Sequence, residues 1–129
     1  MARILIVDDC AEQRGLYGAL LAASGHDVVL AANGREAMKR LRTGTFDLVV
    51  TDIFMPECDG VELIRAVRRA QPRLPILAVS GGGDGGDGIL YLPLAQKLGA
   101  TVALSKAARV QAFLAVVADL LAAGDRAAA

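Results

Sequence analysis

Polar side chains that can take part in chemistry stand at the ends of four short apolar runs in this sequence. They are Asp8 and Asp9 after residues 3–7, Asp52 after 48–51, Ser80 after 76–79 and Lys106 after 102–105. If the runs are parallel strands of one sheet, their carboxyl ends lie at the same edge, where open α/β sheets bind ligands. We therefore expect three carboxylates, a hydroxyl and an ammonium to meet there.

Three carboxylates in one pocket repel each other unless a cation joins them. Mg²⁺ prefers oxygen ligands and usually takes one or two carboxylates directly from protein. We expect Asp9 and Asp52 to bind Mg²⁺ or Mn²⁺, and Asp8 to hold a metal-bound water. A carboxylate can also attack phosphorus and form an acyl phosphate. We predict that Asp52 is this nucleophile, and that Lys106 and Ser80 bind oxygens of the phosphoryl group.

Apolar runs of four or five residues alternate with stretches of helical period, which is typical of repeated β-α units around a parallel sheet. The sequence predicts strands at 3–7, 27–31, 47–51, 75–79 and 101–104, and helices at 11–23, 34–43, 60–70, 91–98 and 108–122. Because parallel crossovers are right-handed, the simplest result is a three-layer α/β/α sandwich of flavodoxin-like type, with a five-stranded parallel sheet of order 2-1-3-4-5. The first and third strands are then neighbours, which brings Asp8 and Asp9 beside Asp52.

Apolar stripes and end signals mark the predicted helices. The first helix is expected to bury Leu16, Ala19, Leu20 and Ala23 and to stop at Gly25, and the last to bury Val110, Phe113, Leu114, Val117 and Leu121. Asp59 is expected to cap the third helix, and Pro72 follows its end. Gly15 and Gly18 in the first helix are either tolerated drift or a smooth face for a partner helix.

The chain of 129 residues fits one domain, with 1–123 as the domain and 124–129 as a short tail. Its formal net charge of zero gives no long-range field that favours nucleic acid or a membrane surface. The basic group at 65–73 is interpreted as a solvated helix face. Without a membrane-spanning or signal-peptide segment we expect a cytoplasmic protein. Cys10 and Cys58 are expected to be free thiols, with a redox input as the alternative.

These residues, in this order, resemble the receiver domain of two-component response regulators along essentially the whole chain. The matching motifs are Val7-Asp8-Asp9, Asp52-Ile53-Phe54-Met55-Pro56 with Asp59-Gly60, and Gly99-Ala100 before Leu104-Ser105-Lys106. The resemblance implies that Asp52 is the phosphorylated aspartate, that Phe54 supplies a backbone carbonyl to the metal, that Ser80 is the switch hydroxyl and that Lys106 pairs with the phosphate. It also implies a histidine kinase or a histidine phosphotransfer protein as donor, an unknown output protein, and no enzymatic activity beyond slow autophosphorylation and self-dephosphorylation.

Two positions depart from the family pattern. Ala107 follows Lys106 where the family usually has proline, which removes the residue that favours a cis peptide there. Ala103 stands where the family usually has an aromatic residue, so no ring can report phosphorylation from this strand. We expect the signal to leave instead through the glycine-rich loop 81–88 and the helix region 90–98, whose extra apolar side chains are predicted to bind a partner or to form a homodimer.

Other protein classes share parts of this pattern. A pseudo-receiver that docks constitutively is one alternative, which the alanines at 103 and 107 keep open. A phosphohydrolase of the haloacid dehalogenase type also forms an aspartyl phosphate, but it needs a second aspartate where this chain has Phe54. In a flavodoxin-like electron carrier, Asp8 and Asp9 would repel the flavin phosphate. The glycine spacing within 81–88 matches a dinucleotide fingerprint, yet it follows the fourth strand and includes acidic residues that disfavour a pyrophosphate.

Overall fold

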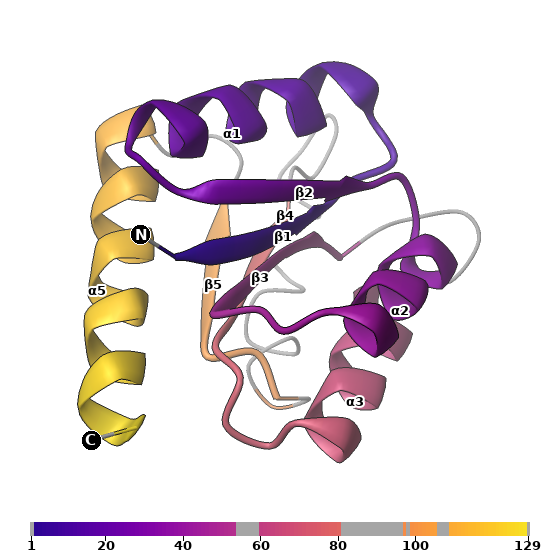
Figure 1. Ribbon diagram of the computed structural model, residues 1–129. Helices are drawn as coiled ribbons and strands as arrows, with labels where there is room; N and C mark the ends of the chain where they lie inside the picture. The colour runs from indigo at the N-terminus through magenta and orange to yellow at the C-terminus, as the bar shows by residue number, and fades with distance from the viewer. Residues whose placement is uncertain (1, 54–59, 81–96, 98, 106–108, 129) are drawn as a thin grey trace.

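A parallel sheet forms the middle layer of the fold (Figure 1). The computed structural model describes residues 2–53, 60–80, 97, 99–105 and 109–128. The strands are β1 (Arg3–Val7), β2 (Asp27–Ala31), β3 (Leu48–Asp52), β4 (Ile76–Ser80) and β5 (Val102–Ser105). The helices are α1 (Ala11–Ala23), α2 (Gly34–Thr43), α3 (Gly60–Ala70) and α5 (Val110–Ala128). The strands pair in parallel in the order β2-β1-β3-β4-β5, which confirms the predicted sheet.

Two hydrophobic cores lie on opposite faces of this sheet. Alternate residues of one strand point to opposite faces, and β1 shows the division: Leu5 packs in the core under α2 and α3, whereas Ile4 and Ile6 pack in the core under α1 and α5. All three side chains are fully buried. Figure 1 shows α2 and α3 on one side of the sheet and α1 and α5 on the other, so the three-layer arrangement is confirmed. No helix within the described residues is long and apolar enough to cross a membrane.

Helix ends follow local signals in the sequence. Gly25 has φ +91°, and its N–H donates to the Ala22 carbonyl while the His26 N–H donates to the Leu21 carbonyl. This pair of bonds is a Schellman motif, which favours glycine at the left-handed position, and it confirms the predicted stop of α1. At the start of α2, the Asn33 side chain accepts the Glu36 N–H at 2.8 Å.

The last three strands lie one residue later than predicted. In the sheet ladder Asp52 pairs with Val79 and Ser80 pairs with Ser105, so both predicted site residues are the last residues of strands rather than the first residues of loops. The hydrogen-bonded ladder, not the end of the apolar run, decides where a strand stops. Helix α5 also differs: it begins at Val110 and continues to Ala128 through the segment expected to be a tail. Three of the six residues of that segment are alanine, the best helix former.

The buried stripe of α1 differs from the prediction. Tyr17 and Leu21 are the buried residues of this helix, whereas Leu16 is 49% exposed and Ala19 and Ala23 are also exposed. The reason is a contact with α5, where the Tyr17 ring stacks on the Phe113 ring with centroids 4.7 Å apart. The face of α1 that carries Tyr17 therefore points to the core. Leu21, one helical turn further on, is buried on the same face, and Leu20 is half-buried beside it.

The stripe of α5 is only partly as predicted. Phe113 and Val117 are buried, and Leu114 and Leu121 are half-buried against the same core. Leu120, which was not predicted, is buried, while Val110 is 46% exposed. The face of α5 that packs on the sheet is centred on Phe113, Val117 and Leu120. Because Val110 stands at the very start of the helix, it lies beyond the edge of this contact.

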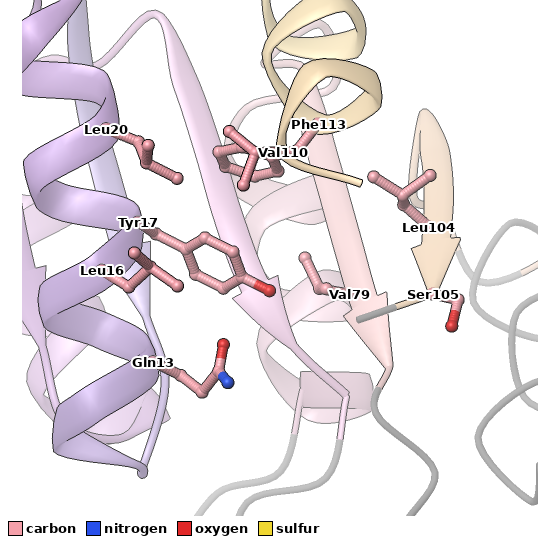
Figure 2. A pocket seen from close by; sticks show the side chains of 9 residues that line it. All are labelled: Gln13, Leu16, Tyr17, Leu20, Val79, Leu104, Ser105, Val110 and Phe113. Carbon is pink, nitrogen blue, oxygen red and sulfur yellow. The ribbon is translucent and has the colours of Figure 1, made fainter. Parts of the chain in front are cut away.

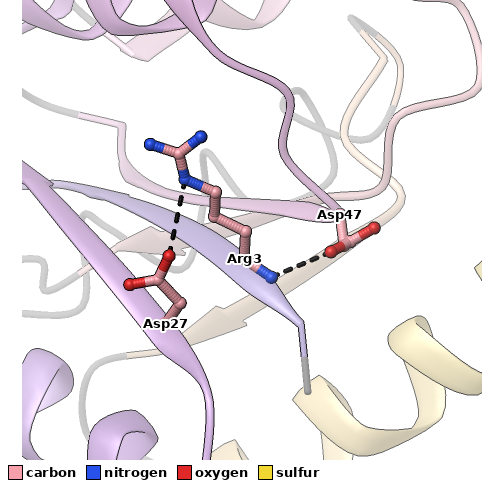
Figure 3. A network of polar contacts seen from close by, with 3 residues as sticks. All are labelled: Arg3, Asp27 and Asp47. Carbon is pink, nitrogen blue, oxygen red and sulfur yellow. Dashed lines mark hydrogen bonds and ion pairs between the residues drawn. The ribbon is translucent and has the colours of Figure 1, made fainter.

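Opposite charges and backbone groups are paired at the amino ends of the first strands (Figure 3). The Arg3 backbone N–H donates to Asp47 Oδ2 at 2.8 Å, and Arg3 Nε lies 3.6 Å from Asp27 Oδ2. The Arg3 guanidinium also lies over the Phe46 ring, 4.9 Å from its centroid. These contacts join the starts of β1 and β2 to the segment that leads into β3.

A second arginine, Arg68, joins the segments that precede β4 and β5 through hydrogen bonds. Arg68, near the end of α3, donates to four backbone carbonyls, those of Gly99 (2.7 Å), Gln71 (3.1 Å), Pro72 (2.9 Å) and Leu74 (2.6 Å). It also lies 3.3 Å from Thr101 Oγ1, which accepts the Ile76 N–H. Burial lowers the pKa of the Arg68 guanidinium, yet an arginine stays charged in proteins at neutral pH. We call these contacts the Arg68 cluster.

Candidate functional site

Strands β1 and β3 place three carboxylates at the carboxyl edge of the sheet. Asp8 directly follows β1, Asp52 ends β3, and the two strands are neighbours with Val7 paired to Thr51. Asp8, Asp9 and Asp52 each offer a carboxylate oxygen, and these oxygens all lie within 4.8 Å of one another. Asp8 and Asp52 are buried and Asp9 is exposed. The predicted convergence of the three aspartates is therefore observed.

The backbone around Asp8 is held by three hydrogen bonds. Its N–H donates to the Ala31 carbonyl at 3.2 Å, and its own carbonyl accepts from Arg14 Nη1 at 2.7 Å. Its side-chain Oδ1 accepts the Cys10 N–H at 2.9 Å, at the start of α1. An N–H at a helix start stabilises a carboxylate, so this oxygen is fixed in direction. Arg14 was not predicted as part of the site, because its hydrogen bond to the Asp8 carbonyl forms only when α1 packs beside the end of β1.

Gly60 brings the start of α3 directly against the turn that follows Asp52. A Cβ at Gly60 would overlap the carbonyl oxygen of Asp52 and the Cα of Ile53, both of which are backbone atoms that cannot move aside. The Gly60 N–H donates to the Ile53 carbonyl at 2.9 Å, and Ile53 N–H donates to the Val79 carbonyl at 3.2 Å. Thr51 Oγ1 donates to the Asp52 carbonyl at 2.9 Å. Only glycine fits this close approach, and the Asp59-Gly60 motif was the signal for it.

The remaining predicted site residues are placed only in part. The backbone of Ser80 ends β4, which lies beside β3 in the sheet, so Ser80 reaches the same edge as Asp52. Phe54, Lys106 and Ala107 lie outside the described residues, although β5 ends at Ser105, immediately before the lysine. The loop 81–88 and the helix region 90–98 also lie outside them, apart from Lys97, which is helical and exposed. Their predicted roles stay predictions.

The structure also describes Ala103, one of the two cysteines and both glycines of α1. Ala103 is half-buried against the core under α2 and α3, on the opposite face of β5 from Leu104. Cys10 is an exposed free thiol, whereas Cys58 lies outside the described residues. A Cβ at Gly18 would meet Leu30 Cδ2 at 3.2 Å, while one at Gly15 would meet open space. Packing thus accounts for one of the two glycines of α1.

A small cavity opens beside the site, between α1 and α5 (Figure 2). Its volume is about 190 Å³, and Val79 and Ser105 line it next to the strand ends. Tyr17 reaches into it from α1, and Val110 and Phe113 approach from α5. The cavity was not predicted from the sequence, because Leu16, which lines it, was expected to be buried.

Comparison with known proteins agrees with this geometry. The family model of the response regulator receiver domain matches residues 4–118. The chain belongs to the response regulator receiver family. This match confirms the resemblance found in the sequence. Receiver domains are the phosphoacceptor modules of two-component signalling.

Curated relatives of this receiver domain are much longer proteins. It is 40% identical over 80 residues to a gliding motility regulatory protein of Myxococcus xanthus, covering 60% of this chain and 10% of that protein. It is 36% identical over 92 residues to the alkaline phosphatase synthesis transcriptional regulatory protein PhoP of Bacillus subtilis, covering 71% of this chain and 38% of that protein. This chain therefore corresponds to less than half the length of either relative.

Solved receiver structures match over nearly the whole chain. A response regulator receiver domain protein from Clostridium thermocellum superposes with a TM-score of 0.86 at 24% identity, covering 97% of this chain and 98% of that one. The response regulator TrrA from Thermotoga maritima, solved in complex with Mg²⁺ and BeF, gives a TM-score of 0.82 at 29% identity and covers 93% of this chain and 99% of that one. The first match shows the shared fold.

Proposed function

We propose that this receiver domain, residues 1–123, takes a phosphoryl group on Asp52 in a two-component system or phosphorelay. The observation that carries the proposal is the convergence of three carboxylates, with oxygens within 4.8 Å of one another, at the strand edge. Like charges this close favour a bound cation, and hard oxygen ligands suit Mg²⁺ or Mn²⁺. Asp9, Asp52 and the Phe54 carbonyl would hold the metal directly, and Asp8 would hold a metal-bound water.

The proposed reaction is a transfer between two side chains. A carboxylate oxygen of Asp52 forms a bond to phosphorus while the phosphorus–nitrogen bond of a donor phosphohistidine breaks and the imidazole leaves. The bound metal supplies neutralisation of the charges on the phosphoryl oxygens. Lys106 pairs with one phosphoryl oxygen and the Ser80 hydroxyl donates to another. Gly60 keeps the start of α3 close to the phosphoacceptor turn, because no larger residue fits there.

The donor in this proposal is a histidine kinase or a histidine phosphotransfer protein in the cytoplasm. The phosphorylated domain acts as a switch that changes a protein-binding surface, and its only chemistry is slow autophosphorylation from small donors and self-dephosphorylation. The region 90–98 is the proposed surface for an output partner or a homodimer. A constitutive pseudo-receiver is the second candidate, because Ala103 is half-buried in the core and offers no ring that could move.

The test is an intact-mass measurement after incubation with acetyl phosphate and Mg²⁺. The wild-type domain should gain the mass of one phosphoryl group, because Asp52 lies where a metal can neutralise both reactants. Asp52→Asn should gain none, and Asp9→Ala should lose labelling together with Mg²⁺ binding. The matched control is Asp27→Asn, which removes an exposed carboxylate at the opposite edge of the sheet and should be labelled like the wild type.

The outcomes separate the candidates. Equal labelling of wild type and Asp52→Asn would rule out Asp52 as the acceptor. Full labelling of Asp9→Ala would place the metal elsewhere. If wild type binds Mg²⁺ yet is labelled neither by acetyl phosphate nor by a phosphorylated phosphotransfer protein, the pseudo-receiver is correct.

A further inference from the structure

Helices α2 and α3, with the three residues that follow α3, concentrate the positive charge of a chain that is neutral overall. Residues 34–43 and 60–73 contain eight of the fourteen basic residues and two of the fourteen acidic residues, so they carry a net charge of +6 and the rest of the chain carries −6. Seven of the basic residues are exposed, and we call their surface the basic face: Arg35, Lys39, Arg40, Arg42, Arg65, Arg69 and Arg73. Figure 1 shows that α2 and α3 lie side by side on the same side of the sheet.

Among the described residues, the charges of the basic face have no ion-pair partner. In the part of the chain that the structure describes, the ion pair is Arg3 with Asp27, and none of the seven side chains makes an ion pair or a hydrogen bond. Arg35 and Lys39 stand four residues apart on α2, and Arg65 and Arg69 do so on α3, a spacing at which like charges repel. Arg68 behaves differently, because its guanidinium turns to backbone carbonyls in the Arg68 cluster.

The chemistry of the basic face favours carboxylate groups as its ligand. Six of its seven residues are arginines, and a guanidinium binds a carboxylate through two parallel hydrogen bonds. The large apolar side chains that are exposed among the described residues are Leu16, Leu30 and Val110, none of them on α2 or α3. A membrane-binding helix needs an apolar face to enter the lipid, and the basic face offers none.

The charge balance of the chain argues against nucleic acid. A duplex carries charge along its whole length, and a chain with a net charge of zero has no long-range attraction for such a polyanion. A short acidic protein segment can stay within the positive area. We propose that the basic face docks a segment rich in Asp and Glu on a partner protein. This surface is separate from the aspartate site and does not depend on phosphorylation of Asp52.

Fluorescence anisotropy with a short labelled peptide of Asp and Glu residues tests this inference on the unphosphorylated, metal-free protein. The wild type should bind the peptide at low salt, should bind it more weakly at about 0.15 M salt, where screening acts within about 8 Å, and should not bind the Asn and Gln version. The double variant Arg65→Glu, Arg69→Glu should lose about tenfold or more in affinity, because two attractive charges become repulsive.

The matched control is the triple variant Arg109→Glu, Gln111→Glu, Ala112→Glu, which lowers the net charge by the same four units at exposed residues outside both the basic face and the region 90–98. It should lose less than about threefold. The neutral variant Arg65→Gln, Arg69→Gln should fall between wild type and charge reversal, and it covers the case in which reversal harms folding. Circular dichroism and acetyl phosphate labelling should be unchanged in all variants, so failure here and failure of the phosphoacceptor proposal are distinguishable.

Three results would overturn the inference. The first is equal loss of affinity in the control and the basic-face variants, which would mean that only net charge matters. The second is absence of peptide binding by the wild type at low salt. The third is tighter binding of a short DNA duplex or of phosphatidylserine vesicles than of the acidic peptide, since the occupant would then be of another class.

Discussion

The two edges of the sheet treat charge in opposite ways. At the carboxyl edge, Asp8, Asp9 and Asp52 bring oxygens of one sign within 4.8 Å of one another. At the amino edge, Arg3 contacts Asp27 and Asp47 (Figure 3). Arg68 donates to a set of backbone carbonyls at the same edge. Groups that satisfy one another stabilise the fold, whereas groups that repel one another lower stability until a ligand joins them. The comparison assigns ligand binding to the carboxyl edge and stability to the amino edge.

The Arg68 cluster gives the largest expected effect on stability. Arg68→Ala would remove the donor from four carbonyls that lie before β4 and β5, and we expect the free energy of unfolding to fall by about 2–3 kcal/mol in urea denaturation, because hydrogen bonds from a charged donor are strong. The neighbouring Arg69→Ala, which removes an exposed arginine, should change it by less than about 0.5 kcal/mol. Equal effects of the two variants would contradict the assigned role of the amino edge.

A smaller effect of opposite sign is expected at the carboxyl edge. In the absence of Mg²⁺, Asp52→Asn should raise the free energy of unfolding by about 1 kcal/mol, because it relieves repulsion from Asp8 and Asp9. Added Mg²⁺ should stabilise the wild type more than the variant, since a ligand stabilises the state that binds it. Thermal unfolding with and without Mg²⁺ measures both terms. A variant that is less stable than wild type without metal would break the comparison.

The smallest effect is expected at the exposed ion pair of the amino edge. Asp27→Ala removes the partner of the Arg3 guanidinium, but both side chains are about half exposed and the atoms are 3.6 Å apart. Such pairs contribute about 0–0.5 kcal/mol, and the difference should vanish at high salt. Asp47→Ala should cost more, about 1 kcal/mol, because Asp47 accepts a backbone N–H at 2.8 Å. A larger cost for Asp27→Ala than for Asp47→Ala would contradict this ranking.

Much of the candidate site was predictable because it depends on strand ends. Once the apolar runs form a parallel sheet, Asp8 and Asp52 must reach the same edge, and the structure brings them together with Asp9. Ser80 was expected just after a strand and is instead the last residue of β4, since ladder pairing with β5 extends the strand by one residue. For Lys106 and Phe54 the sequence remains the only basis, because both lie outside the described residues.

The order of the elements, the layering of the fold and the edge at which the aspartates meet were predictable from the sequence alone. These follow from local periodicity and from the handedness of parallel crossovers, which any such chain obeys. Local signals also sufficed at Gly25, where the chain needs a left-handed residue to end α1.

The buried face of α1 and the hydrogen bonds of the amino edge depend instead on contacts between segments distant in sequence. Tyr17 packs into the core because its ring meets Phe113 on α5, and Arg68 finds its partners at Gly99 and Thr101, more than thirty residues along the chain. Leu16 is as apolar as a core residue, yet its side chain is half exposed. Periodicity records only which residues of one helix share a face. The choice among faces is made by side chains on segments distant in sequence, whose shapes and donors become neighbours only on folding.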